Sequence, residues 1–191
     1  MEVCVADNDG MKTGAIVTAP GQELCLACGM CCDGTLFIWA PLAAEDEGGA
    51  LEGFAVGDEP RKGGAHFDLP CSHLDGRRCT LYQAWRPRVC HTFRCKLLRA
   101  FEAGEIDLLE AQTIIERTTE LAGRVRAQLR ELTGGRQGAL GALFLAWKEE
   151  MEQGGPEWMA RHERFLMEFY ALQYRLDKAF RKKGAQSPGG Q

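Results

Sequence analysis

Eight of the nine cysteines in this chain of 191 residues fall into two groups. The first group has the spacing C-x-x-C-x-x-C-C, and the second is more widely spaced. Their members are Cys25, Cys28, Cys31 and Cys32, followed by Cys71, Cys79, Cys90 and Cys95. The thiolate is the form of cysteine that ligates a metal, and a bound metal keeps it deprotonated at neutral pH. Eight thiols are enough for two sites of four ligands each, or for one cluster with some thiols left unused. They indicate a metal-binding or iron–sulfur protein.

Disulfide bonds are the competing interpretation of these cysteines. Secreted disulfide scaffolds are usually short, have an even number of cysteines and begin with a signal peptide. Here the count is odd, and the first residues show no basic segment followed by an apolar one. The adjacent pair Cys31 and Cys32 also suits a normal bridge poorly. We therefore favour metal ligation, with Cys4, which stands apart in an acidic stretch, as a bystander.

The composition predicts a single domain in a reducing compartment. The hydrophobic fraction of 45% is ordinary, and no apolar run is long enough to cross a bilayer. With neither a targeting segment nor a membrane span in the sequence, we expect a cytoplasmic protein that does not enter a membrane.

The net charge of −4 conceals an uneven distribution. Residues 1–70 carry twelve acidic and three basic side chains, whereas residues 71–99 carry seven basic side chains and one acidic. Such a basic stretch can bind nucleic acid, and Tyr82, Trp85 and Phe93 are aromatic residues able to stack on bases. Guanidinium groups also compensate the charge of nearby thiolates. We favour the second interpretation, because the chain as a whole is acidic, and we do not expect nucleic acid as a partner.

The periodicity predicts a mainly α protein whose loop-rich N-terminal half contains short strands. We expect an N-terminal segment over 1–22, a cysteine-cluster region over 23–98, a helical region packed on it over 99–183 and a tail over 184–191. Leu36–Trp39 resembles a short buried strand, residues 40–66 a long Gly- and acid-rich loop, and Asp75-Gly76 a tight turn.

The second half carries the helical signals. A short helix is expected over Lys96–Ala103, and Asp107 with Glu110 forms a capping box that starts a helix ending near Leu132. Further helices are expected over Ala139–Gln153 and from Pro156 to Phe180, each with an apolar stripe. His162 lies on the stripe of the last helix and is expected to be a buried, hydrogen-bonded core residue.

The spacing of the cysteines leaves the type of metal open. Zinc modules commonly combine two C-x-x-C pairs, and Cys25 with Cys28 can pair in that way with cysteines of the second group. A C-x-x-C-x-x-C run also matches the one with which ferredoxins hold a 4Fe–4S cluster. In an extended backbone Cys31 and Cys32 would point to opposite sides, which fits a cluster or two adjacent sites better than one ion.

Several short motifs resemble those of the CxxCxxCC family. After the first group come Pro70-Cys71-Ser72-His73-Leu74 and then Cys79-Thr80-Leu81-Tyr82, followed by Arg86-Pro87-x-x-Cys90-x-x-Phe93. That family is described as zinc- or iron-chelating and includes small YkgJ-like proteins and the flagellin lysine N-methylases. The resemblance covers about residues 24–96, and the metal ligands that it implies are Cys25, Cys28, Cys31, Cys32, Cys71, Cys79 and Cys90. Cys95 lies just past the family's usual ending, in which an Arg and a Pro are here replaced.

Three further residues complete the predicted site, namely Tyr82, Arg86 and His91, as candidates for contact with the bound group. For Tyr82 and Arg86 we favour a structural role over substrate binding, and His66 and His73 also lie near cysteines. We expect a protein that holds an iron–sulfur cluster, used in electron transfer or substrate activation with a redox or protein partner. The alternative is a structural zinc module. A methylase-like enzyme is less favoured, because no Gly-rich loop suited to S-adenosylmethionine is present.

Overall fold

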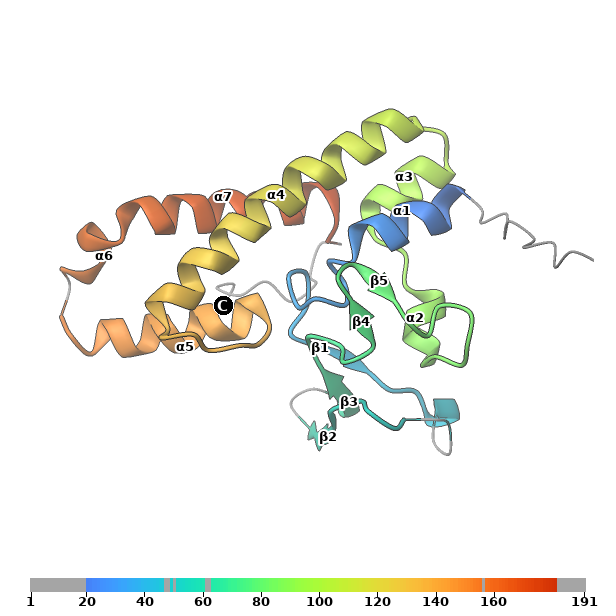
Figure 1. Ribbon diagram of the computed structural model, residues 1–191, viewed down its shortest axis with the longest axis horizontal. Helices are drawn as coiled ribbons and strands as arrows, with labels where there is room; N and C mark the ends of the chain where they lie inside the picture. The colour runs from blue at the N-terminus through green and yellow to red at the C-terminus, as the bar shows by residue number, and fades with distance from the viewer. Residues whose placement is uncertain (1–19, 47–48, 50, 61–62, 156, 182–191) are drawn as a thin grey trace, which may run out of the picture.

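The computed structural model of the chain describes residues 20–46, 49, 51–60, 63–155 and 157–181 (Figure 1). Cys4, most of the expected segment 1–22 and the expected tail 184–191 lie outside these ranges. The helices are α1 (Pro20–Cys28), α2 (Arg88–Thr92), α3 (Lys96–Glu102), α4 (Leu108–Leu132), α5 (Leu140–Glu152), α6 (Trp158–Arg161) and α7 (Glu163–Ala179). The strands are β1 (Trp39–Pro41), β2 (Val56–Glu59), β3 (Gly64–Asp68), β4 (Leu74–Asp75) and β5 (Arg78–Cys79), and η1 (Ala44–Asp46) is a 3-10 helix. The mainly α class with short strands in the N-terminal half is confirmed.

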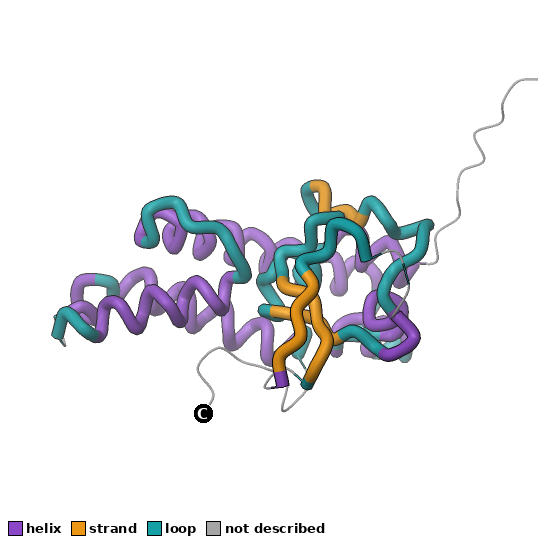
Figure 2. The backbone as a smooth tube through the Cα atoms, turned by 90° about the horizontal axis from the view of Figure 1, so that it is seen from below, coloured by secondary structure: helices purple, strands orange, loops and turns teal. Residues whose placement is uncertain are grey.

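The long helix α4 connects the two parts of the molecule. Its N-terminal part contacts α1 and α3, and its C-terminal part contacts α5, while α7 packs along it (Figure 1). The strands and α2 lie on one side of α1 and α3, away from α6 (Figures 1 and 2). The helices of the C-terminal half thus form a platform from which the cysteine-bearing part extends.

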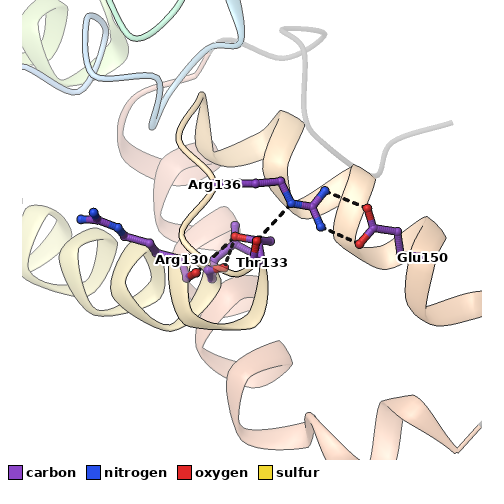
Figure 3. A network of polar contacts seen from close by, with 5 residues as sticks. Arg130, Thr133, Arg136 and Glu150 are labelled. Carbon is purple, nitrogen blue, oxygen red and sulfur yellow. Dashed lines mark hydrogen bonds and ion pairs between the residues drawn. The ribbon is translucent and has the colours of Figure 1, made fainter.

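The predicted start of α4 is confirmed by its cap. Asp107 adopts an extended conformation, and its carboxylate accepts a hydrogen bond of 2.8 Å from the Glu110 N–H. An N-cap carboxylate satisfies an amide that has no partner within the helix. At the other end, Arg136 makes a two-pronged ion pair of 2.6 and 2.7 Å with Glu150 of α5 and donates to the Thr133 carbonyl (Figure 3). These bonds fix the α4–α5 connection.

The last predicted helix is interrupted, so the single helix expected from Pro156 to Phe180 was wrong. His162 has φ −116° and ψ 18° and separates α6 from α7, and Pro156 itself lies outside the described residues. The His162 ring bonds the Trp158 carbonyl through Nδ1 at 2.8 Å and packs edge-on against Trp147. The expected hydrogen bond is present, but the residue is half-buried at the junction.

The long loop predicted over residues 40–66 was also wrong in part. This segment contains β2 and the start of β3, which with β1 form an antiparallel sheet of order β1-β3-β2. His66 and Phe67 of β3 are buried despite the Gly- and acid-rich surroundings. The expected strand Leu36–Trp39 begins only at Trp39, because the preceding residues belong to a turn. The strands are too short for sequence periodicity to reveal.

Two apolar clusters make up the interior. The larger one joins α4, α5 and α7, and it also takes in Leu24, Met30 and Leu36 from the first cysteine segment. The smaller one has only Phe67, Leu69 and Ala139 as fully buried members. The cysteine-bearing part therefore shares its main core with the helices, while its sheet has little core of its own.

Within the larger cluster, Phe144 of α5 stacks on Phe169 of α7 at 3.6 Å between ring centroids and is buried. We predict that Phe144→Ala lowers the free energy of unfolding by about 3–5 kcal/mol, because a large buried side chain is replaced by a cavity. The neighbouring Leu145 is 41% exposed, so Leu145→Ala is the matched control and should change stability by less than about 1 kcal/mol. Denaturant titrations of both variants test this, and equal losses would contradict the assigned core.

Candidate metal centre

The first cysteine group begins on a helix and not in a loop. Cys25 and Cys28 lie one turn apart on α1, and therefore on the same face of that helix. Gly29 ends the helix with φ 66°, and a Cβ there would lie 2.8 Å from the Arg77 carbonyl oxygen. Only glycine allows this approach, which brings the end of α1 against the β4–β5 hairpin.

Cys31 and Cys32 lie in the turn that follows, so the extended backbone expected for them was wrong. The Cys32 N–H donates to the Gly29 carbonyl at 2.9 Å, and the Leu36 N–H donates to the Met30 carbonyl at 3.0 Å. Residues 29–36 are called the cysteine turn below. Its internal hydrogen bonds set the positions of both thiols.

Two arginines from the helical half anchor the cysteine turn, and sequence reasoning missed both. Arg126 of α4 donates to the Asp33 carbonyl and to the Thr35 hydroxyl, each at 2.9 Å. Arg181, which is 2% exposed, donates to the Leu36 carbonyl at 3.3 Å and to the side chain of Gln173 at 2.8 Å. A buried carbonyl needs a donor, and these guanidinium groups supply it from residues about 90 and 145 positions away. Nothing in the sequence around an arginine on a helix indicates that it will donate to a distant backbone carbonyl.

The hairpin β4–β5 carries the start of the second group. The Cys71 N–H donates to the Cys32 carbonyl at 2.7 Å, which joins the two groups through their backbones. Leu74 pairs with Cys79 across the hairpin, and Gly76 has φ 58° at the predicted Asp75-Gly76 turn. The turn expected there is confirmed, and it places Cys79 next to the segment that holds Cys71.

Asp46 positions the helix that carries Cys90. Although it lies in the acid-rich segment, its side chain is buried, and its two oxygens accept from the Arg88 and Ala43 N–H groups, each at 2.8 Å. The first of these bonds caps α2 from a distance of 42 residues. The sequence shows Asp46 only as one acid among several, so this role was missed.

Cys95 is the N-cap of α3. Its Sγ accepts from the Leu98 N–H at 3.4 Å, and the next residue, Lys96, donates its N–H to the Phe180 carbonyl at 3.1 Å. Because α3 packs against α1, the Cys95 thiol lies on the side of the first group.

All eight cysteines line one cavity of about 470 Å³. Its walls are mainly apolar and include Met30, Leu36, Phe37 and Phe93, together with Tyr82 and Arg86. In the part of the chain that the structure describes, no three Cys, His, Asp or Glu side chains converge closely enough to hold a single ion. The thiols surround a volume and do not meet at a point.

Burial raises the pKa of the Cys28, Cys31, Cys32 and Cys90 thiols, and repulsion from neighbouring thiolates raises it further. The pKa values of Cys28 and Cys32 rise to about 12 and that of Cys90 to about 11, while that of Cys31 is raised well above the ordinary value. A cavity of this kind disfavours free thiolates. A metal ion or the metal core of a cluster, placed among these thiols, would supply the positive charge that stabilises their ionised form.

The thiolates that raise one another's pKa fall largely into two sets of neighbours. For Cys28 and Cys31, the charges that raise the pKa include those of Cys95 and Cys25, with Cys31 also opposed by the adjacent Cys32. For Cys32 the sources are Cys90, Cys71 and Cys79, and for Cys90 they include Cys71 and Cys79. Cys95 is thus an electrostatic neighbour of Cys28 and Cys31, and Cys32 of Cys71, Cys79 and Cys90, although Cys32 also raises the pKa of Cys31.

Arg86 and Tyr82 lie between these sets. The Arg86 guanidinium stacks over the Tyr82 ring at 4.2 Å and approaches His91 Nδ1 at 3.4 Å. Its charge lowers the pKa of both Cys25 and Cys90, against the larger effect of burial. Burial raises the pKa of Tyr82, and the Cys25 thiolate adds to this. The structure brings these two candidate residues to the thiols, whereas His91 is exposed and reaches them through Arg86.

The other histidines are engaged elsewhere. His66 is buried in β3 and its Nδ1 lies 3.0 Å from the Gly64 carbonyl oxygen. His73 lines the cavity, but its Nε2 lies 3.0 Å from the Glu52 carbonyl oxygen, and its ring packs on Phe54. Both contacts are structural.

A family model matches the part of the chain that carries the clustered cysteines. Residues 24–119 match the CxxCxxCC family, described as a "Putative zinc- or iron-chelating domain". The match covers half of the chain and all eight clustered cysteines, so the chain belongs to this family. No curated protein and no solved structure matches the sequence. Among the described helices, none has both the length and the apolar character needed to cross a bilayer.

The raised pKa values predict that metal binding releases protons. At pH 7.5 the Cys28, Cys32 and Cys90 thiols are protonated in the metal-free protein, since their pKa values lie at about 11 or above. Each thiol that becomes a ligand loses its proton, so affinity should fall roughly tenfold per released proton for each unit that the pH drops. Calorimetric titration of metal-free protein with Cd²⁺, in two buffers of different ionisation enthalpy, counts these protons. Heats that do not depend on the buffer would show that the ligands are already ionised.

Proposed function

We propose that the protein holds iron–sulfur clusters through its clustered cysteines and uses them in electron transfer or in activating a substrate. The observation that carries this proposal is the lining of one mainly apolar cavity by all eight cysteines. A cluster held by cysteine thiolates takes up and releases single electrons. The sulfur-only donor set fits such a group, since soft thiolates select iron–sulfur clusters, zinc and copper(I).

The spacing of the thiols favours a polynuclear group. Four thiolates on a zinc ion, each about 2.3 Å from it, would lie only about 3.8 Å from one another. Here the thiols line a cavity of about 470 Å³. A cluster of several atoms matches their separation better than a single ion does. The run Cys25, Cys28, Cys31 adds the ferredoxin-like spacing to this argument.

The surrounding residues would control the properties of a bound cluster. Apolar walls such as Leu36, Phe37 and Phe93 exclude water from the cavity, which affects the potential at which an electron is accepted. Arg86 adds a positive charge next to Cys25 and Cys90. This charge would favour the reduced, more negative state of a cluster.

A structural zinc module is the alternative, and one observation favours it. Among the described residues, the smaller apolar cluster has three buried members, Phe67, Leu69 and Ala139. A segment with so little core commonly depends on a metal crosslink for its fold. Under this alternative the protein would be colourless and would serve partner binding. A reducing compartment such as the cytoplasm suits either form, because free thiols persist there.

Purification without oxygen, followed by elemental analysis and a visible spectrum, distinguishes the two. We expect iron with acid-labile sulfide, and broad absorption near about 400 nm that bleaches on reduction. Stoichiometric zinc without colour would establish the alternative instead.

The double variant Cys28→Ser/Cys71→Ser takes one ligand from each cysteine group and should lose most of the metal, because a hydroxyl is a poor soft-metal ligand. Cys4→Ser is the matched control and should retain the wild-type content.

The basic stretch offers a second test, in which Arg86 is compared with Arg99. Arg86 contacts Tyr82 and lies among the thiols, whereas Arg99 is an exposed residue of the same stretch on α3. Arg86→Gln should make the cluster harder to reduce and quicker to be lost to a chelator, while Arg99→Gln should leave both unchanged. Redox titration and chelator kinetics measure these effects. Tight, steeply salt-dependent binding of DNA or RNA, weakened equally by both changes, would instead assign the stretch to nucleic acid.

A further inference from the structure

We propose that the eight cysteines form two separate four-thiolate sites that meet at the peptide bond between Cys31 and Cys32. The helical site consists of Cys25, Cys28, Cys31 and Cys95. The hairpin site consists of Cys32, Cys71, Cys79 and Cys90. This inference rests on the proposed function in taking the cysteines as the ligands of iron–sulfur clusters, with one cluster at each site.

The helical site is built by α1, α3 and the cysteine turn. Cys25 and Cys28 share a face of α1, and α3 packs against α1 with Cys95 at its first turn. Cys28, Cys31 and Cys95 all pack against the larger apolar cluster. Cys95 is 64 residues from Cys31, so only the packing of α3 on α1 gives the helical site its fourth thiol.

The hairpin site is built by β4, β5 and α2. Cys32 is joined to Cys71 by the backbone hydrogen bond of 2.7 Å, and the hairpin places Cys79 beside the same segment. Cys71 and Cys90 pack against the smaller apolar cluster and not the larger one. Asp46 fixes the start of α2 and thereby the place of Cys90.

The cysteine turn separates the two sites. Cys31 packs towards the larger cluster, whereas the carbonyl of Cys32 is committed to Cys71 on the hairpin side. Arg126 and Arg181 hold the turn at Asp33, Thr35 and Leu36, the residues that follow Cys32. A single centre that used both adjacent thiols would have to break these contacts.

Charge also fits two neighbouring sites. Four thiolates around a divalent ion, or around a cluster core of the same charge, leave two negative charges at each site. Arg86 is an electrostatic neighbour of Cys25 in the helical site and of Cys90 in the hairpin site. One guanidinium between the sites therefore reduces the repulsion between them.

Metal content of single variants tests the division. We expect Cys95→Ser and Cys79→Ser each to retain about half of the wild-type metal per chain, and the double variant to retain almost none. Elemental analysis with native mass spectrometry gives the content of each molecule, and Cys4→Ser is the control. A single centre would give a different pattern, in which one variant loses all of its metal while the other keeps it, or both lose all of it.

A measurement on the wild-type chain guards against variants that fail to fold. Metal-free protein is reconstituted with iron and sulfide in the absence of oxygen, and the iron, the acid-labile sulfide and the absorption near about 400 nm are measured per chain. We expect two clusters per chain, whereas saturation at one cluster would overturn the division. A chain that takes up no cluster under these conditions would overturn the proposed function as well, so the two failures are distinguishable.

Discussion

The arrangement of the thiols depends on the cysteine turn and on the guanidinium groups that hold it. Residues 29–36 carry two adjacent cysteines and several backbone carbonyls into the interior, where each polar group needs a partner. Arg126 and Arg181 donate to these carbonyls from two different places in the helical half. Arg181 is itself buried, and its ion pair with Asp177 at 3.0 Å offsets part of the cost of burying the charge. Losing either arginine would remove a donor from a backbone carbonyl of the turn.

The helical half therefore acts as a rigid support and the cysteine-bearing half as the part that it positions. α4 reaches both halves, and the larger apolar cluster continues beneath the cysteine turn through Met30 and Leu36. The hairpin side has few buried apolar residues and depends on specific bonds, such as those of Asp46. Thiols held at a pKa of 11 or more on this side gain their charge only together with a metal, which links occupancy to the local fold.

Much of the helical half could be predicted from local signals. The cap at Asp107 and the apolar stripe that follows it fixed α4, and the spacing of the cysteines together with the short motifs around them pointed to the family. Local signals failed where the structure is set by contacts distant in sequence. α1 was missed because its cysteines suggested a loop, and β2 and β3 were missed because their residues resemble a polar connection. The break at His162 arises from a bond to Trp158 that periodicity does not register.

The sequence alone determined the donor set, because cysteine spacing is a covalent property of the chain. It also determined the helical class, because helix signals lie within a few residues of one another. Only the tertiary structure decided which thiols are neighbours. In the proposed division, Cys95 joins the first group through the packing of α3 on α1, and Cys32 leaves it through its backbone bond to Cys71. Cys31 and Cys32 are adjacent in the chain but have different neighbours. Core packing acts on Cys31, whereas a backbone hydrogen bond from Cys71 acts on Cys32, and no local sequence pattern encodes either contact.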